Sequence, residues 1–145
     1  MSSVSTYLNF AGNTEEAFLF YKSVFGTEFD GGIMRMSEAP IEEGKTLSES
    51  EKNAVMHVQL PILGGHVLMG TDITASMGFD VIKGNNVYIN LQPDTKAETE
   101  RLFKALSAGG TIEMELQEAF WGDYYGSCID KFGTRWMVNC SEKKK

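Results

Sequence analysis

Two short segments, YLNF at residues 7–10 and YINL at residues 88–91, determine the fold that this chain predicts. Both alternate apolar and polar residues as a half-buried strand does. Each is followed within a few residues by the pattern of a helix start, Asn13 with Glu16 and Thr95 with Glu98. The sequence therefore predicts one structural unit that occurs twice.

The rest of the chain supports this repeat. After the first strand, the pattern predicts an apolar helix stripe, ended by Gly26, and strands at 27–36, 54–60 and 66–71. The second half gives a strand at 86–92, a helix ended by Gly109, and strands at 111–119, 125–130 and 134–140. GGHVLMG aligns with FGTRWMV and places Met69 over Met137. We predict an α+β fold of two βαβββ modules, about residues 1–72 and 84–141, in a single domain spanning 1–145. The first helix stripe is predicted to be Ala17, Phe20, Tyr21 and Val24.

Composition narrows the class of protein. The chain has 145 residues, of which 42% are hydrophobic, and a net charge of −7. We expect no nucleic-acid partner, because phosphates require a basic surface. No apolar run approaches the roughly 20 residues that span a membrane, and no secretory signal is visible, so we expect a cytoplasmic protein without a membrane partner. Cys128 and Cys140 are expected to be reduced packing thiols. The acidic segment 37–53 is either a lid over a site or an exposed insertion.

Three stretches carry a family resemblance: YLNFAGNTEEAFLFYKSVFG at 7–26, GGHVLMGTD at 64–72 and FWGDYYGSCIDKFGTRW at 120–136. With the repeated βαβββ order they resemble the vicinal oxygen chelate superfamily, which includes glyoxalases, bleomycin-resistance proteins and dioxygenases. The details look closest to its PhnB-like branch, the 3-demethylubiquinone methyltransferase-like family. The resemblance implies that each curled mixed sheet forms half of a cup around a ligand, within one chain or across a homodimer.

The resemblance also locates a metal site that the sequence does not supply. Metal-dependent members carry His or Glu on the first and last strands of each module. Those positions fall on Thr6, Met69, Val87 and Met137. Such side chains do not form the nitrogen and oxygen site that Fe, Mn, Ni or Zn requires. We expect no metal and no other cofactor, and methyl transfer is not expected because no glycine-rich cofactor loop is present.

His57 is the predicted acid or base of the cup. Strand alternation places Met56, Val58 and Leu60 against the helix and His57 on the cavity face, with His66 on the opposite face. The alternative is a histidine that only hydrogen-bonds within the wall. The residues predicted to bind the ligand are Gln59, Met69, Trp121, Tyr125, Met137 and Asn139.

Two functions remain open from the sequence. The first is binding of a small organic molecule in a metal-free cup, with vestigial or metal-independent catalysis through His57. The second is non-catalytic sequestration of a cationic drug, as in bleomycin-resistance proteins, in an acidic cleft with an aromatic edge. The net charge of −7 favours the second, and the polar cluster around His57 favours the first. A homodimer is expected for either.

Overall fold

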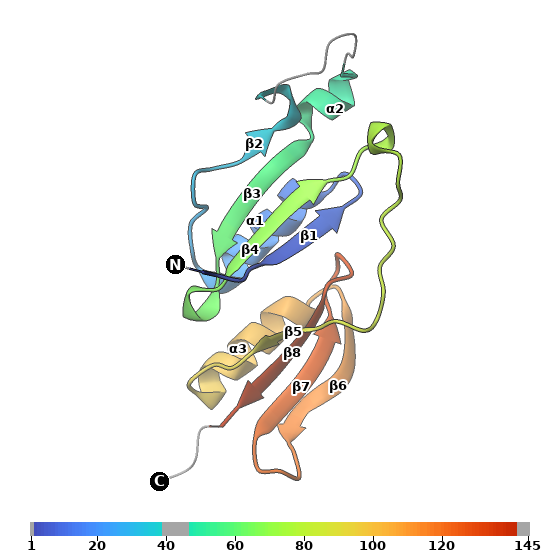
Figure 1. The fold of residues 1–145 in the computed structure, drawn as a ribbon. Helices are drawn as coiled ribbons and strands as arrows, with labels where there is room; N and C mark the ends of the chain where they lie inside the picture. Colours follow the sequence, from blue (N-terminus) through green and yellow to red (C-terminus); the bar gives the residue numbers. More distant parts are fainter. Residues whose placement is uncertain (1, 39–46, 142–145) are drawn as a thin grey trace. The chain divides into compact units, whose positions relative to one another are not determined.

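The computed structural model describes residues 2–38 and 47–141. The chain divides into two compact units, Met1–Ile82 and Lys83–Lys145, and each has its own sheet and its own long helix (Figure 1). Each is described by itself below.

Unit 1 contains a four-stranded mixed sheet in the order β1-β4-β3-β2. Strands β1 and β4 run parallel, and the other neighbours are antiparallel. Its elements are β1 (Thr6–Phe10), α1 (Thr14–Phe25), β2 (Met34–Arg35), η1 (Met36–Glu38), α2 (Glu49–Asn53), β3 (Val55–Pro61), η2 (Leu63–Gly65), β4 (Val67–Asp72) and η3 (Ala75–Met77).

Unit 2 repeats this topology with the sheet order β5-β8-β7-β6. Here β5 and β8 are the parallel pair. Its elements are β5 (Ile89–Leu91), α3 (Lys96–Ser107), β6 (Thr111–Glu118), β7 (Tyr124–Ile129) and β8 (Arg135–Cys140). The shared order confirms the α+β fold of two βαβββ modules.

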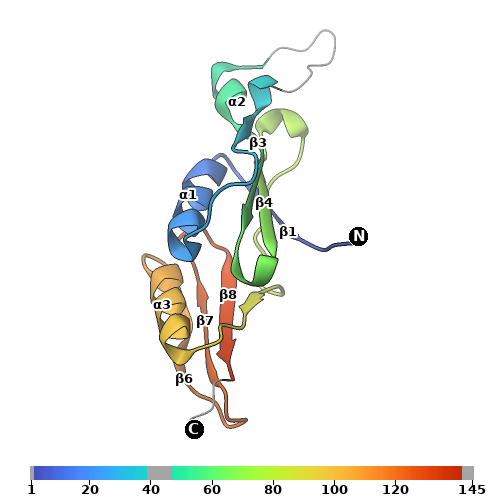
Figure 2. The same ribbon diagram turned by 90° about the vertical axis from the view of Figure 1, so that its left-hand side faces the viewer.

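The core of each unit lies between the helix and one face of the sheet (Figure 2). In α1 the buried apolar residues are Ala17, Phe18, Tyr21 and Val24. The stripe was predicted with Phe20, but Phe20 is only half-buried and Phe18 is fully buried instead. Gly70 explains the difference, because a Cβ there would lie 2.5 Å from the ring of Phe18. The missing side chain on β4 makes room for that ring.

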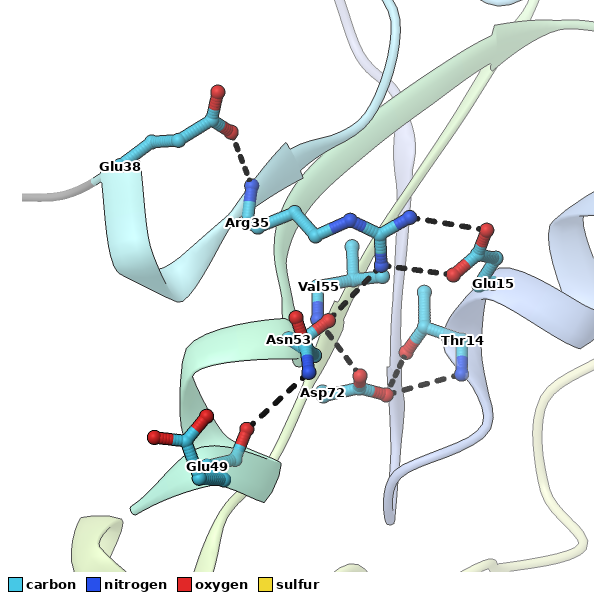
Figure 3. A network of polar contacts seen from close by, with 8 residues as sticks. All are labelled: Thr14, Glu15, Arg35, Glu38, Glu49, Asn53, Val55 and Asp72. Atoms are coloured by element: carbon cyan, nitrogen blue, oxygen red, sulfur yellow. Dashed lines mark hydrogen bonds and ion pairs between the residues drawn. The ribbon is translucent and has the colours of Figure 1, made fainter. Parts of the chain in front are cut away.

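The N-terminus of α1 is capped from outside the helix (Figure 3). The buried carboxylate of Asp72 accepts hydrogen bonds from the backbone N–H and the hydroxyl of Thr14, at 3.0 and 2.6 Å. Its second oxygen accepts from the backbone N–H of Val55 at 2.8 Å. Asn13 is the N-cap residue, as predicted, but its side chain makes no capping hydrogen bond. In α3 the predicted cap is confirmed, since Thr95 accepts from the backbone N–H of Glu98.

Two strand predictions need correction. The strand predicted at 27–36 is reduced to β2, because Gly31 and Gly32 adopt left-handed conformations, with φ of 80° and 75°, and turn the chain. In β3, Met56 is exposed rather than packed on the helix. Met34 pairs with His57 and Arg35 with Val55, so Met56 forms a bulge and Val55 takes the buried position.

The described residues of the acidic segment 37–53 form a short helix as well as loop. Its end forms α2, which Ser48 and Glu51 begin with a reciprocal capping box. Arg35 makes a bidentate pair with Glu15 at 2.8 and 3.1 Å and also donates to the carbonyl of Asn53 (Figure 3). This pairing holds the pKa of Glu15 below its usual value. Residues 39–46, which the predicted lid includes, lie outside the described residues.

Both cysteines lie in the core of unit 2. Cys128 and Cys140 are buried free thiols, and burial raises the pKa of Cys128 to about 12. Within residues 2–38 and 47–141, no helix combines the length and the apolar character needed to cross a bilayer.

Candidate functional site

Each sheet has one face that its helix does not cover, and we call this the open face. In unit 1, Tyr7, Met69 and Gln59 lie side by side across β1, β4 and β3 on this face. Their neighbours along the strands, such as Val58 and Leu68, are buried toward α1. The predicted grouping of His57, Gln59 and Met69 on one face agrees with this register.

The two histidines lie on different faces. His66 hydrogen-bonds to the hydroxyl of Thr6 at 2.8 Å. Thr6 pairs with Leu68, which is buried, so Thr6 points to the helix side of the sheet. The β1 residue on the open face next to Met69 is therefore Tyr7. The side chains of His57 and His66 lie on opposite faces of the sheet and therefore cannot bind the same ion, as predicted.

Four side chains form a hydrogen-bonded chain across the open face of unit 1. The Tyr7 hydroxyl lies 3.2 Å from Nδ1 of His57, and Nε2 of His57 lies 3.1 Å from Oε1 of Gln59. Gln59 in turn donates from Nε2 to Asp30 at 2.7 Å. The backbone N–H of Asp30 also donates to the Gln59 carbonyl, so two hydrogen bonds hold Asp30 to Gln59 of β3. We call these residues the Tyr7–Asp30 chain.

Sequence reasoning identified His57 and Gln59 but missed both ends of this chain. Tyr7 could have been found by extending the strand alternation from β3 to β1, because the parity places it on the same face as Met69. Asp30 could not have been found, because it precedes the left-handed Gly31 and Gly32 in a segment predicted as a strand, with at most a bulge at these two glycines.

On the open face of unit 2, the structure brings three predicted ligand residues together. Trp121 donates from Nε1 to Oδ1 of Asn139 at 3.4 Å, and its ring contacts that of Tyr125 edge-on at 5.5 Å between centroids. Asn139 donates from Nδ2 to Asp123 at 2.9 Å. Trp121 keeps 51% of its surface exposed. Met137 lies on the same face, next to Asn139 along β8.

A charged cluster on this open face was not predicted. Arg135 donates to Glu113 at 2.9 Å and to the Tyr88 hydroxyl at 3.3 Å, and Tyr88 donates to Glu113 at 2.7 Å. The hydrogen bond from Arg135 to Tyr88 raises the pKa of Arg135, and the negative charge of the nearby Glu113 raises it further.

The register also corrects the alignment of the repeat. Asn9 pairs with Thr71, whereas Asn90 pairs with Met137. Because Asn9 and Asn90 are repeat equivalents, Met137 corresponds to Thr71 rather than to Met69. The predicted alignment of GGHVLMG with FGTRWMV, which placed Met69 over Met137, is therefore shifted by two residues. Both methionines nonetheless remain on open faces, because a shift of two preserves strand parity.

The residues present do not fit the metal that the superfamily uses elsewhere. At the predicted positions Val87 is 71% exposed and precedes β5, Thr6 faces the helix side, and Met69 and Met137 offer thioether sulfur. Thioethers suit soft ions rather than an octahedral oxygen-rich site. Within the described residues no three His, Cys, Asp or Glu side chains cluster as metal ligands.

A pocket of about 430 Å³ lies elsewhere in unit 1, near the N-terminus of α1. Its lining comes from the β1–α1 turn, α2 and the segment after β4, and includes Glu15, Glu51, Asp72 and Thr74. Each of these carboxylates accepts hydrogen bonds from other protein groups. Figure 3 shows Glu15 with Arg35, and Asp72 with Thr14 and Val55. Glu51 accepts from Ser48 and Ser76. None of the predicted site residues lines this pocket.

Comparison with known proteins identifies the family. The sequence model of 3-demethylubiquinone-9 3-methyltransferase matches residues 2–139. Protein YjdN of Escherichia coli strain K12 is 29% identical over 145 residues, which cover 94% of this chain and 93% of that protein. The crystal structure of PA1353 from Pseudomonas aeruginosa is 34% identical, with a TM-score of 0.81, and covers 99% of this chain and 100% of that one.

More distant structures share the fold. A Bacillus cereus PhnB protein, described as a putative 3-demethylubiquinone-9 3-methyltransferase, is 24% identical with a TM-score of 0.74 and covers 96% of this chain and 99% of that one. Two structures described as glyoxalase/bleomycin resistance protein/dioxygenase proteins are 18% and 11% identical, with TM-scores of 0.61 and 0.64. The chain therefore belongs to the 3-demethylubiquinone-9 3-methyltransferase family, and it shares its fold with the PhnB protein and with the glyoxalase/bleomycin resistance protein/dioxygenase proteins.

Proposed function

We propose that this protein binds a small organic molecule on the open face of unit 1, and that His57 is the group that takes up a proton released by this molecule, without a metal. The observation that carries the proposal is the Tyr7–Asp30 chain. Imidazole is the side chain whose ordinary pKa allows proton transfer near neutral pH. A histidine held by hydrogen bonds at both ring nitrogens is oriented for that task, and Met69 beside it supplies apolar contact surface.

Proton transfer is testable without knowing the natural ligand. The probes are simple ketones and α-hydroxy ketones in D₂O, and the measurement is deuterium incorporation at the carbon next to the carbonyl by NMR. We expect exchange with the wild-type protein and at least a tenfold loss in His57→Gln. His66→Gln is the matched control, because His66 lies on the helix side and should keep the wild-type rate. Equal rates in both variants would remove His57 from the chemistry.

Sequestration of a cationic aromatic molecule is the second candidate, and unit 2 favours it. Phe120 and Trp121 form an edge-on pair at 5.0 Å, and Phe120 is 97% exposed. Aromatic faces attract cations, and the net charge of −7 adds to that attraction. The test is thermal stabilisation by phenyltrimethylammonium against its uncharged isostere, tert-butylbenzene. Selective stabilisation by the cation supports sequestration, and equal responses exclude it.

We also propose that the functional form is a homodimer, as the superfamily's clefts imply. Light scattering during size-exclusion chromatography measures this directly, and a mass of one 16.1 kDa chain across the concentration range would contradict it.

A further inference from the structure

We propose that Tyr7 is the residue that contacts the ligand and exchanges the proton with it, and that Asp30 and Gln59 are positioning residues that fix the tautomer of His57. This inference rests on the proposed function, because it assigns the chemistry of the same open face. It adds two residues that the sequence did not identify and names the class of ligand.

The orientation of the Gln59 amide follows from Asp30. An ionised carboxylate has only acceptor oxygens, so the amide atom that faces it at 2.7 Å must be the NH₂ group. The amide oxygen of Gln59 then points to Nε2 of His57, at 3.1 Å. The charge of Asp30 therefore decides which end of the amide the histidine meets.

The tautomer of His57 follows from Gln59. A carbonyl oxygen can only accept, so Nε2 of the neutral imidazole must carry the proton, and Nδ1 must carry the lone pair. The opposite tautomer would set two lone pairs against each other at 3.1 Å. The Tyr7 hydroxyl, 3.2 Å from Nδ1, is consequently the donor to His57.

This arrangement leaves the oxygen of Tyr7 as an acceptor toward solvent. Its proton is directed at His57, its lone pairs are not used by His57, and half of the side chain is exposed. A ligand that meets this oxygen must supply a donor. The ligand class is a molecule with an acidic O–H or N–H group, such as an enol, a phenol or an ammonium compound.

The proton transfer balances within the chain of residues. The ligand's X–H bond breaks and its proton forms a new O–H bond on Tyr7, while the original Tyr7 O–H bond breaks and its proton forms an N–H bond at Nδ1 of His57. The products are the conjugate base of the ligand (an anion from an enol or a phenol, a neutral amine from an ammonium compound), a neutral Tyr7 and an imidazolium. The Gln59 carbonyl keeps its hydrogen bond from the Nε2–H of that imidazolium.

The first test reads the tautomer in the free protein, by long-range ¹H–¹⁵N NMR of the two histidines at about pH 8.5, well above the ordinary histidine pKa of about 6.5. We expect Nε2–H for His57 in the wild type and in Tyr7→Phe. Asp30→Asn should give a mixture of tautomers, because an asparagine can present either group to Gln59. The His66 signals serve as the internal control. Nδ1–H in the wild type, or no change in Asp30→Asn, overturns the inference.

The second test uses 4-nitrophenol, which has the donor, and 4-nitroanisole, which lacks it. We expect wild-type protein to bind 4-nitrophenol at least tenfold more tightly, and Tyr7→Phe to lose that preference. The absorbance of bound phenolate, at a pH where the free probe is mostly un-ionised, should fall in Asp30→Asn. Equal affinities, no binding of either probe, or an unchanged preference in Tyr7→Phe overturns the role of Tyr7. The tautomer needs no ligand, so the relay and the proposed function can fail separately.

Discussion

The open faces of the two units carry the same arrangement of carboxylate, amide and ring, but the ring differs between them. In unit 1 a carboxylate orients an amide, and the amide accepts from a ring N–H: Asp30, Gln59 and His57. In unit 2 Asp123, Asn139 and Trp121 do the same. The difference lies in the ring, because imidazole has a second nitrogen and indole does not. The chain therefore continues to Tyr7 in unit 1 and ends at Trp121 in unit 2.

This contrast separates the two proposed functions by module. A ring with a second basic nitrogen can accept a proton, so unit 1 has the residues for chemistry. An oriented indole cannot, but it offers a rigid aromatic surface, so unit 2 has the residues for contact. The two proposals therefore assign proton transfer to the open face of unit 1 and recognition to the open face of unit 2.

The largest expected effect concerns the buried aspartates that hold each unit together. Asp72 connects α1 to the strands of unit 1, and Asp130 accepts from Phe132, Thr134 and the indole of Trp136 in unit 2. Asp72→Ala and Asp130→Ala each leave several buried donors without an acceptor, so each should cost about 3–5 kcal/mol. Hydrogen exchange should show the lost protection chiefly in the mutated unit. Equal loss in both units for either variant would mean that the units unfold together.

A smaller effect is expected at the glycines under the helices. A Cβ on Gly70 would lie 2.5 Å from the fully buried Phe18, and one on Gly126 would lie 2.9 Å from Phe103. Both Gly→Ala variants should lose about 1–3 kcal/mol in denaturant unfolding, with the greater loss for Gly70→Ala. Phe18→Leu should partly offset Gly70→Ala in the double variant; strict additivity would show that the Phe18 contact is not the cause.

The two orienting carboxylates should differ in their effect on chemistry. Asp30→Asn should slow deuterium exchange at least tenfold, because His57 is then no longer held in one tautomer. A tenfold change corresponds to about 1.4 kcal/mol of activation free energy. Asp123→Asn should stay within twofold, because no proton can pass through Trp121. Equal slowing by both variants would contradict the contrast between the modules.

The smallest expected effect is a loss of folding stability at alkaline pH, and it is confined to unit 2. The folded pKa of Cys128, about 12, lies above the ordinary value of 9.0 because of burial. The stability this thiol contributes is therefore full below about pH 9 and is lost as pH rises toward the folded value. We expect a loss of about 1 kcal/mol at about pH 10, seen as a shallower pH slope in Cys128→Ala. An identical slope in that variant would exclude the thiol as the cause.

The fold was predictable because its signals are local and repeated. Alternation at residues 7–10 and 88–91, together with Thr95 capping its own helix, indicated the two modules directly. Contacts between distant residues were not predictable: Asp72 caps a helix 58 residues away, and Gly70 determines that Phe18 rather than Phe20 is buried.

The site was half predictable for the same reason. Parity along one strand placed His57 and Gln59 on the same face. Tyr7 and Asp30 join them only through sheet pairing and a glycine turn, which a single sequence does not specify.

The most direct test of the account is to locate a bound probe by amide chemical-shift changes in the wild-type protein titrated with 4-nitrophenol. The account predicts the largest changes at Tyr7, His57, Gln59 and Met69 on the open face of unit 1. Changes concentrated instead around Gly12, Ser50 and Thr74, at the pocket near the N-terminus of α1, would contradict it.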